Sequence, residues 1–358
     1  MDPLTHALSG ALLARAVSPT VQGAALRESR LFGPRVPLRQ VLIVGLTAAA
    51  LPDVDIVLTL VSELAYLRGH RGVTHSLVML PLWSLLLGGL FALLFRRRDA
   101  WRRYSWLAAG GIAIHIAGDW ITQFGTMLLA PMSDARFGLG SVFIIDLVFT
   151  GLIVAGLAVS ALLPRSRLPA WTALALLALW IGVTVVGRNE ALAVGRDYAR
   201  QQGISTVLVD AAPRPASPFN WTVIVFDGAD YHVAHLNTRR KETLPANADD
   251  NFVRRYSAPY APAHLAHWTR LSMFGDDAAA AALAREAWNQ PDFAFFRWFA
   301  MFPLLYAVDR GQQTCVWFHD LRFTFPGRDR GPFVYGMCDG SGWSAWSFDE
   351  SGHRSVSR

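Results

Sequence analysis

The sequence predicts a mainly α-helical protein: a polytopic helical membrane domain with about five or six spans, followed by a small β-rich or α+β domain outside the membrane. Hydrophobic residues make up 53% of the 358 residues, and 29 glycines come in addition, which is more than soluble domains usually carry. The runs 76–95 and 168–187 contain no ionisable side chain. From about residue 188 the pattern changes, so we predict a membrane-embedded domain over 1–187 and an extracytoplasmic domain over 188–358.

Five apolar runs approach or reach the length of about 20 residues with which a helix crosses a bilayer. A sixth run, 3–17, is shorter and carries Arg15, so it is either a short span, a re-entrant segment or an interfacial helix, and we count it as a span. A multi-pass protein of the bacterial inner membrane follows from this pattern. The five longer runs are 41–62, 76–95, 104–124, 140–163 and 168–187.

The arginines predict the orientation of these spans. With six spans, the segments 15–39, 96–103 and 165–167 lie on one face and together hold twelve arginines, whereas the opposite loops hold three. The positive-inside rule places the twelve in the cytoplasm, and both termini with the C-terminal domain in the periplasm. Since the membrane loops account for the net charge of +6, no nucleic-acid partner is expected.

The C-terminal domain is predicted from short runs of strand-forming residues. These runs are 221–226, 314–318 and 333–337, separated by Gly, Pro and Asp, with one helical stretch at 276–289. The only two cysteines of the chain, Cys315 and Cys338, fall in this half, and a periplasmic location would allow them to form a disulfide.

The apolar runs contain ionisable residues, which are costly inside a membrane and usually functional. With a helical rise of about 1.5 Å per residue, they all reach one level near the outer face of the membrane, where three histidines flank them. The set consists of Asp53, Asp55, His115, Asp119 and Asp146 within the runs, and His6, His70 and His75 beside them.

The spacing of these residues predicts a metal site. His115 and Asp119 are four residues apart, so they project from one face of a helix, and Asp53 and Asp55 follow the helix-breaking Pro52. Imidazole and carboxylate ligands without thiolate suit Zn²⁺, and also Mn²⁺ or Fe²⁺. The number of ligands exceeds one tetrahedral site, so more than one ion is expected, and a binuclear cluster suits phosphoester cleavage.

These motifs resemble a known family. Thr5-His6, Pro52-Asp53-Val54-Asp55, the run His70-Arg71-Gly72-Val73-Thr74-His75-Ser76 and His115-Ile-Ala-Gly-Asp119, in this order, look like the YdjM-type, LexA-binding, inner-membrane-associated hydrolases. The resemblance covers about 1–160, and the His115/Asp119 pair is also similar to the ligand pair of zinc-dependent phospholipase C and P1-type nucleases. It implies metal ligation by His6, Asp55, His70, His75, His115 and Asp119, with Asp53 and Asp146 as weaker members.

The sequence thus predicts a metal-dependent hydrolase that acts at the periplasmic face on a lipid-like or other phosphoester or ester substrate, with membrane lipid as its partner. Asp53 and Arg71 are the expected catalytic residues, since an arginine holds a phosphate or carboxylate oxygen with two hydrogen bonds. Two other classes stay open. One is a transporter that passes protons or ions through the same side chains, and the other is a non-catalytic membrane partner protein.

Some of these residues also have plainer interpretations. Asp146 could accept a hydrogen bond from a ligand histidine, His70 could be a solvated loop residue, and Arg71 could anchor at lipid headgroups. Two further histidine pairs, His232 with His235 and His264 with His267, lack a carboxylate motif, so we expect surface histidines rather than a second metal site.

Overall fold

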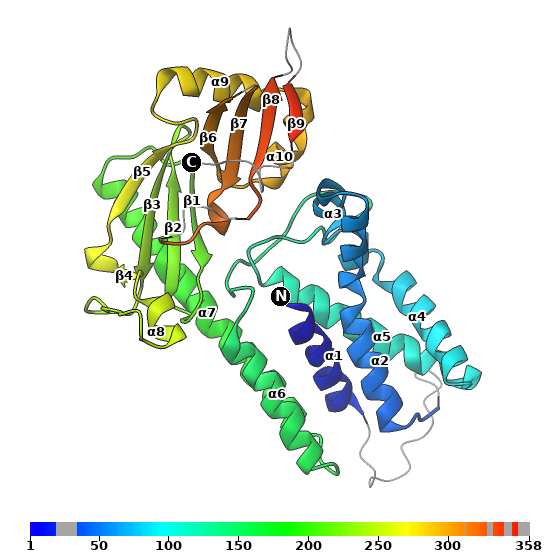
Figure 1. The fold of residues 1–358 in the computed structure, drawn as a ribbon. Coiled ribbons are helices and arrows are strands. Elements are labelled where there is room, and N and C mark those ends of the chain that lie inside the picture. Colours follow the sequence, from blue (N-terminus) through cyan, green and yellow to red (C-terminus); the bar gives the residue numbers. More distant parts are fainter. Residues whose placement is uncertain (19–33, 312, 328–331, 340–345, 350–358) are drawn as a thin grey trace. The chain divides into compact units, whose positions relative to one another are not determined.

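The computed structural model describes residues 1–18, 34–311, 313–327, 332–339 and 346–349. The chain divides into two compact units, Met1–Gly187 and Arg188–Arg358. The first is helical and the second contains two β-sheets (Figure 1). Helix α7 (Leu168–Gln201) crosses the boundary between the two units without a break.

The helical unit is a set of closely packed helices, with three short 3₁₀ helices among its described residues. Small residues allow close approach of the backbones, as is typical of membrane helices. A Cβ atom at Gly10 of α1 would lie 2.2 Å from the carbonyl oxygen of Gly45 on α2, and one at Gly111 of α5 would lie 2.9 Å from the same oxygen. The helices are α1 (Pro3–Val17), α2 (Leu38–Ala50), α3 (Glu63–Gly69), α4 (Leu80–Leu94), α5 (Trp101–Trp120) and α6 (Leu147–Leu162).

Apart from α1 and α7, the helices are shorter than the apolar runs predicted. In the described part of the chain, α7 alone is long and apolar enough to cross a membrane, and the number rises to three if each of two bent helix pairs is one span. The run 41–62 is split at Pro52 into α2 and the 3₁₀ helix η1 (Pro52–Leu60), with a bend of 47°. Helix α6 begins only at Leu147, because Asp146 caps it. The expectation of five or six spans therefore exceeds what helix length and composition show.

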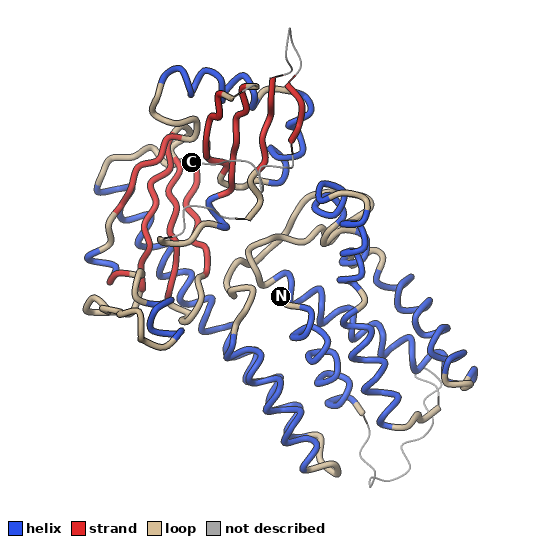
Figure 2. Tube along the Cα trace, viewed as in Figure 1, coloured by secondary structure: helices blue, strands red, loops and turns tan. Residues whose placement is uncertain are grey.

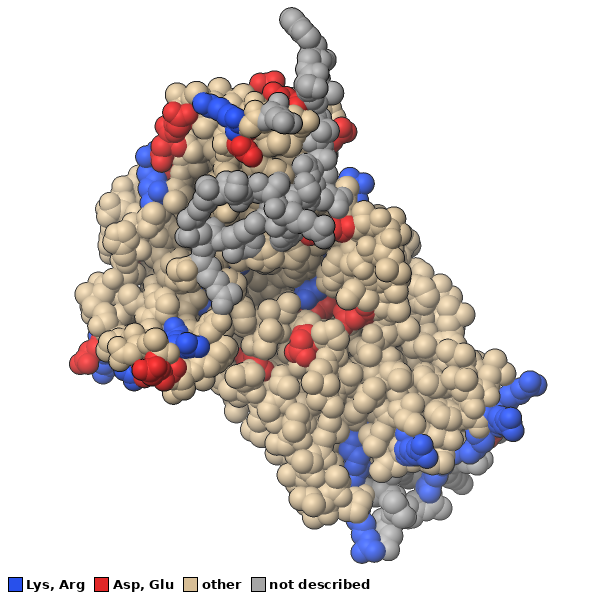
Figure 3. Space-filling model, in the orientation of Figure 1, with Lys and Arg blue, Asp and Glu red and all other residues tan. Residues whose placement is uncertain are grey.

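Charged side chains are unevenly distributed over the helical unit. Arginines gather at the end where α4 ends and α5 begins, and acidic side chains show near the other end (Figure 3). Arg15 is buried and donates hydrogen bonds to the carbonyls of Pro164 and Ser166. It thereby ties the end of α1 to the α6–α7 turn. Two of the twelve arginines counted above, Arg27 and Arg30, lie outside the described residues.

The C-terminal unit contains two antiparallel sheets, which confirms the predicted β-rich character (Figure 2). In the first, β1 (Leu208–Pro213), β2 (Asn220–Phe226) and β3 (Asp230–Asn237) are neighbours in this order, and β3 also pairs with β5 (Trp268–Ser272) and, in parallel, with the two-residue β4 (Ala261–Pro262). The second has the order β6 (Pro303–Arg310), β7 (Thr314–Asp320), β8 (Tyr335–Asp339) and β9 (Trp346–Asp349). Three helices accompany them: α8 (Phe252–Ser257), α9 (Ala278–Trp288) and α10 (Ala294–Phe299).

A disulfide cross-links two neighbouring strands of the second sheet. Cys315 on β7 lies directly opposite Cys338 on β8, and the two sulfurs are bonded. The aromatic side chains of Trp288, Phe293 and Phe296 pack against Phe318 on β7 and form the core between this sheet and its helices.

A buried histidine makes the stability of the C-terminal unit depend on pH. Both ring nitrogens of His319 lack a hydrogen-bond partner among the described residues, and burial lowers the pKa of His319 from 6.5 to about 4 against a smaller opposing effect of Asp320. Between these two pH values the unfolded chain binds a proton that the folded chain excludes, so stability falls as the pH falls. The loss reaches about 2 to 3 kcal/mol.

We predict that thermal unfolding of the C-terminal unit, followed by circular dichroism from pH 7 to pH 4.5, moves to lower temperature in the wild type and by about half as much in His319→Phe, because burial also lowers the pKa of His235 to about 4. His264→Phe changes an exposed histidine and serves as the control. Equal shifts in wild type and His319→Phe would show that His319 does not titrate in this way.

Candidate metal centre

Proline and a tight turn place the first two parts of the site. Pro52 ends α2 and starts η1, whose first turn carries Asp53 and Asp55. In the loop after α3, Arg71 has a φ of 58°, a left-handed conformation that is uncommon for a residue with a side chain. This turn directs both Arg71 and the following 3₁₀ helix η2 (Val73–His75) toward the interior, where His75 is fully buried.

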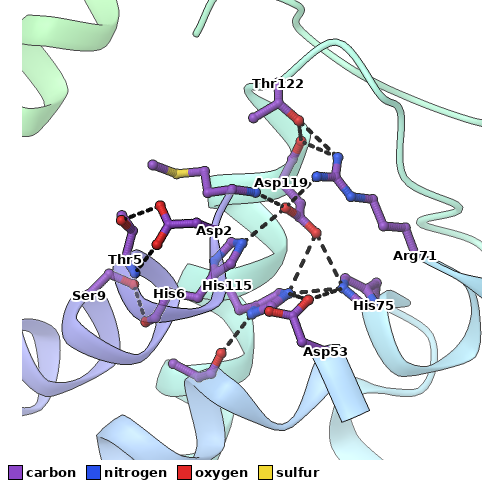
Figure 4. A network of polar contacts seen from close by, with 12 residues as sticks. Asp2, Thr5, His6, Ser9, Asp53, Arg71, His75, His115, Asp119 and Thr122 are labelled. Carbon is purple, nitrogen blue, oxygen red and sulfur yellow. Dashed lines mark hydrogen bonds and ion pairs between the residues drawn. The ribbon is translucent and has the colours of Figure 1, made fainter. Parts of the chain in front are cut away.

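Helix α5 supplies the third part. His115 and Asp119 are one turn apart on the same face, and both are buried. Ser76, directly after η2, links it to the loop that follows α5, because its hydroxyl donates to the carbonyls of Leu128 and Ala130. The site is therefore built on three separate segments, as Figure 4 shows.

One ligand atom from each of four residues converges in the centre of this site. These atoms, from Asp53, His75, His115 and Asp119, all lie within 4.8 Å of one another. The Nε2 atoms of His75 and His115 are 2.9 Å apart. Asp119 Oδ2 lies 3.2 Å from the first and 3.5 Å from the second, and Asp53 Oδ1 lies 3.7 and 3.6 Å from them (Figure 4).

The hydrogen bonds of the other ring nitrogens fix the two imidazole tautomers. His115 Nδ1 lies 2.6 Å from the carbonyl oxygen of Ala49, which can only accept, so the proton is on Nδ1. His75 Nδ1 lies 2.9 Å from the hydroxyl of Thr74 and 3.5 Å from a carboxylate oxygen of Asp55, which favours the same tautomer. Both Nε2 atoms therefore present lone pairs to each other.

In each of the two carboxylates, Asp53 and Asp119, one oxygen likewise has no hydrogen-bond donor among the described residues. Asp119 Oδ1 receives three donors: the amine of Met1 at 2.5 Å, His6 Nε2 at 3.0 Å and the guanidinium of Arg71 at 2.9 Å. Asp119 Oδ2 and Asp53 Oδ2 are buried without a hydrogen-bond partner among the described residues. Buried polar atoms almost always have a partner, so converging lone pairs without hydrogens point to a cation. These four residues fit a divalent metal ion.

The remaining predicted residues surround the four. His6 stacks on the ring of His115, with 3.7 Å between centroids, and its Nε2 is hydrogen-bonded to Asp119. His70 Nδ1 is 3.1 Å from both carboxylate oxygens of Asp55. Arg71, besides its ion pair with Asp119, donates to Thr122 Oγ1 at 2.8 Å. His6, Asp55 and His70 lie outside the group of four whose ligand atoms are within 4.8 Å of one another, so metal ligation by these three residues stays a prediction.

Asp146 has other partners. Its two carboxylate oxygens accept hydrogen bonds from the backbone N–H of Phe149 and from Trp180 Nε1, so it caps α6 and links this helix to α7. Two groups that the sequence did not reveal complete the site: the hydroxyl of Thr122 and the carbonyl of Ala49. Thr122 follows Asp119 by three residues, a spacing that could have indicated it, whereas a backbone carbonyl leaves no signal in the sequence.

The fold and the site define the class: a membrane-associated helical unit with a buried His/Asp cluster, followed by a β-rich unit. The family model for the YdjM inner membrane protein matches residues 1–191, slightly more than half of the chain, and the chain belongs to this family. It is 27% identical over 146 residues to the uncharacterized protein YfhP of Bacillus subtilis, a match that covers 41% of this chain and 42% of that relative. No solved structure matches.

We predict that the metal content of variants distinguishes ligands from surrounding residues. Each variant of the full chain is purified in detergent and loaded with zinc or manganese, and its bound metal is measured by elemental analysis. The pair His115→Ala and Asp119→Ala loses the metal, because half of the converging atoms are removed. Thr74→Val, which removes a hydrogen-bond partner of His75, weakens metal affinity by about 10 to 100-fold.

The matched control is Asp146→Asn, since Asp146 has its own partners on α6 and α7. It should keep the full metal content. A well-folded wild type that takes up no metal would contradict the assignment, as would equal metal content in wild type and the double variant.

Proposed function

We propose that this protein is a membrane-bound metal-dependent hydrolase that acts on a lipid-like or other phosphoester or ester substrate at the periplasmic face. The convergence of four metal-binding atoms in a buried site carries this proposal. The donor set of two imidazoles and two carboxylates favours Zn²⁺, with Mn²⁺ and Fe²⁺ as alternatives. Asp55 and His70 lie next to His75 and could bind a second ion.

Charge and cysteine chemistry support the proposed location. Arginines gather at the end of the helical unit where α4 meets α5, and the positive-inside rule assigns such an end to the cytoplasm (Figure 3). The acidic side chains lie near the other end, which would then face the periplasm. The disulfide between Cys315 and Cys338 favours a periplasmic C-terminal unit, because disulfides persist in oxidising compartments. Six spans, with both termini outside, agree with this orientation.

The surroundings of Asp53 and Asp55 favour an amphiphilic substrate. The 3₁₀ helix η1 that carries both carboxylates continues into a run of large apolar side chains that the fold leaves uncovered: Ile56 is 59% exposed, Val57 52%, Leu60 87% and Val61 77%. Soluble proteins rarely leave such a run open to water, whereas a lipid environment suits it. A substrate with a hydrocarbon part could thus reach the polar site along the membrane, with lipid as the protein's partner.

The residues of the site have different roles in the proposed reaction. When bound, a divalent ion of this class polarises an ester or phosphoryl oxygen and activates water at neutral pH. His75, His115 and Asp119 are fully buried and hold the ion in a water-poor site, while Asp53 is 18% exposed and is the member that can exchange a proton with an incoming substrate or water. Arg71 keeps Asp119 ionised, and its Nε–H is a buried donor that a substrate oxygen could use.

We predict that the metal-loaded protein hydrolyses phosphoester or carboxylic ester substrates that carry an acyl chain at least about tenfold better, in kcat/KM, than water-soluble analogues with the same scissile group, since burying a few methylene groups supplies more than 1.4 kcal/mol. Asp53→Asn should lose most of kcat, whereas Asp146→Asn should keep it. Chromogenic esters and phosphodiesters of two chain lengths, presented in mixed micelles, measure both effects.

Retained metal without turnover on any of these substrates would contradict hydrolysis and favour the partner-protein class. Metal-dependent proton or cation flux in liposomes, again without turnover, would favour a transporter.

We also predict that protease added to spheroplasts cleaves the C-terminal unit without cell lysis, because this unit is proposed to lie in the periplasm. Mass spectrometry of the released fragments should show Cys315 and Cys338 joined until a reductant is added. Cleavage only after lysis, or alkylation of both thiols without reductant, would place this unit in the cytoplasm.

A further inference from the structure

The first sheet of the C-terminal unit contains a cavity of about 340 Å³. His235 on β3 and His267 just before β5 both line it, and because Ala234 pairs with Trp268, these two histidines follow as cross-strand neighbours on the same face. The other walls are mainly apolar, with Val233, Leu265 and Leu271 among them, and they include no acidic residue. We propose that this cavity binds a small carboxylate with a hydrocarbon body.

A chain of hydrogen bonds behind the cavity determines what His235 offers. Arg214 is buried, and its Nε–H donates to Thr222 Oγ1 at 2.6 Å. Thr222 Oγ1 lies 2.8 Å from His235 Nδ1. Since the guanidinium already donates to the hydroxyl oxygen, every group is satisfied when Thr222 donates its own proton to Nδ1. The His235 proton then sits on Nε2, so the ring presents a hydrogen-bond donor to a ligand.

The charge behind the cavity favours an anion. Apart from Thr222, the hydrogen bonds of Arg214 go to the uncharged carbonyl oxygens of Arg322 and Leu321. The nearby Asp320, which attracts Arg214, is itself paired with Arg322 at 2.8 Å. Arg240, which donates to the carbonyls of Ser257 and Tyr260, adds a second guanidinium near the cavity wall formed by Pro259. A carboxylate would accept the Nε2–H of His235 in a field of positive sign.

A metal ion fits this cavity less well than it fits the membrane unit. Among the described residues, three or more metal-binding side chains come together only at Asp53, His75, His115 and Asp119. His235 and His267 are two imidazoles without a third ligand, and burial, with a smaller effect of Arg214, lowers the pKa of His235 to about 4, which keeps its ring neutral. A neutral donor in front of a buried cation is suited to bind an anionic oxygen.

The test measures binding of butyrate, hexanoate and benzoate to the full chain in detergent by saturation-transfer NMR, with butylamine, hexylamine and benzylamine as size-matched probes. We expect the carboxylates to bind and the amines not to bind. His235→Phe keeps the ring and removes the donor, and Thr269→Trp fills the cavity without touching Thr222 or Arg214. Each should weaken carboxylate binding at least about tenfold, the loss of one charge-assisted hydrogen bond or of the cavity itself.

His264→Phe changes a neighbouring exposed histidine outside the cavity lining and should bind like the wild type. Carboxylate binding that survives Thr269→Trp in a folded protein, or equal binding of carboxylates and amines, would overturn the proposal. So would the absence of carboxylate binding to the wild type at millimolar concentrations. The assay needs no metal and no turnover, so its result is independent of the hydrolase proposal.

Discussion

The structure of the helical unit depends on one electrostatic constraint: several lone pairs meet in a buried place where no hydrogen of the protein lies between them. His75 and His115 face each other with unprotonated nitrogens 2.9 Å apart, and a carboxylate oxygen of Asp119 points at both. Without a positive charge between them, these atoms repel one another in a medium of low dielectric constant. Contacts with Thr74, Ala49, Arg71 and His6 hold His75, His115 and Asp119 in this arrangement and prevent them from turning away.

Much of this site could be predicted from the sequence because its residues follow simple spacing. His115 and Asp119 share a helix face, and Pro52 marks the helix break after which Asp53 and Asp55 appear. What the sequence could not separate was ligand from support. His6 and Asp55 are the same residue types as the four central residues; in the structure they are hydrogen-bonded to Asp119 and His70, and their role as ligands stays a prediction. Asp146 looked equivalent for the same reason, although it caps α6 and binds Trp180.

The fold shows a similar division. The change from apolar runs to short strands near residue 188 predicted a helical and a β-rich unit, and the predicted helix at 276–289 corresponds to α9. The helix lengths were harder to predict, because hydropathy does not register a bend. Pro52 splits one apolar run, and the stretch Glu63–His75 is bent by 79° relative to α4. The histidine pairs of the C-terminal half were expected at the surface, but His235 is largely buried and hydrogen-bonded, which depends on strand pairing that composition does not reveal.

The central claim is that His75, His115, Asp53 and Asp119 bind a metal ion directly. X-ray absorption spectroscopy at the zinc edge, on the loaded full chain in detergent, tests it most directly. The account predicts a first shell of mixed nitrogen and oxygen ligands at about 2.0 to 2.2 Å, with the outer-shell signal of two imidazole rings, and the loss of half of that signal in His115→Ala. A shell of oxygen atoms alone, unchanged in His115→Ala, would show that zinc binds elsewhere and would contradict the account.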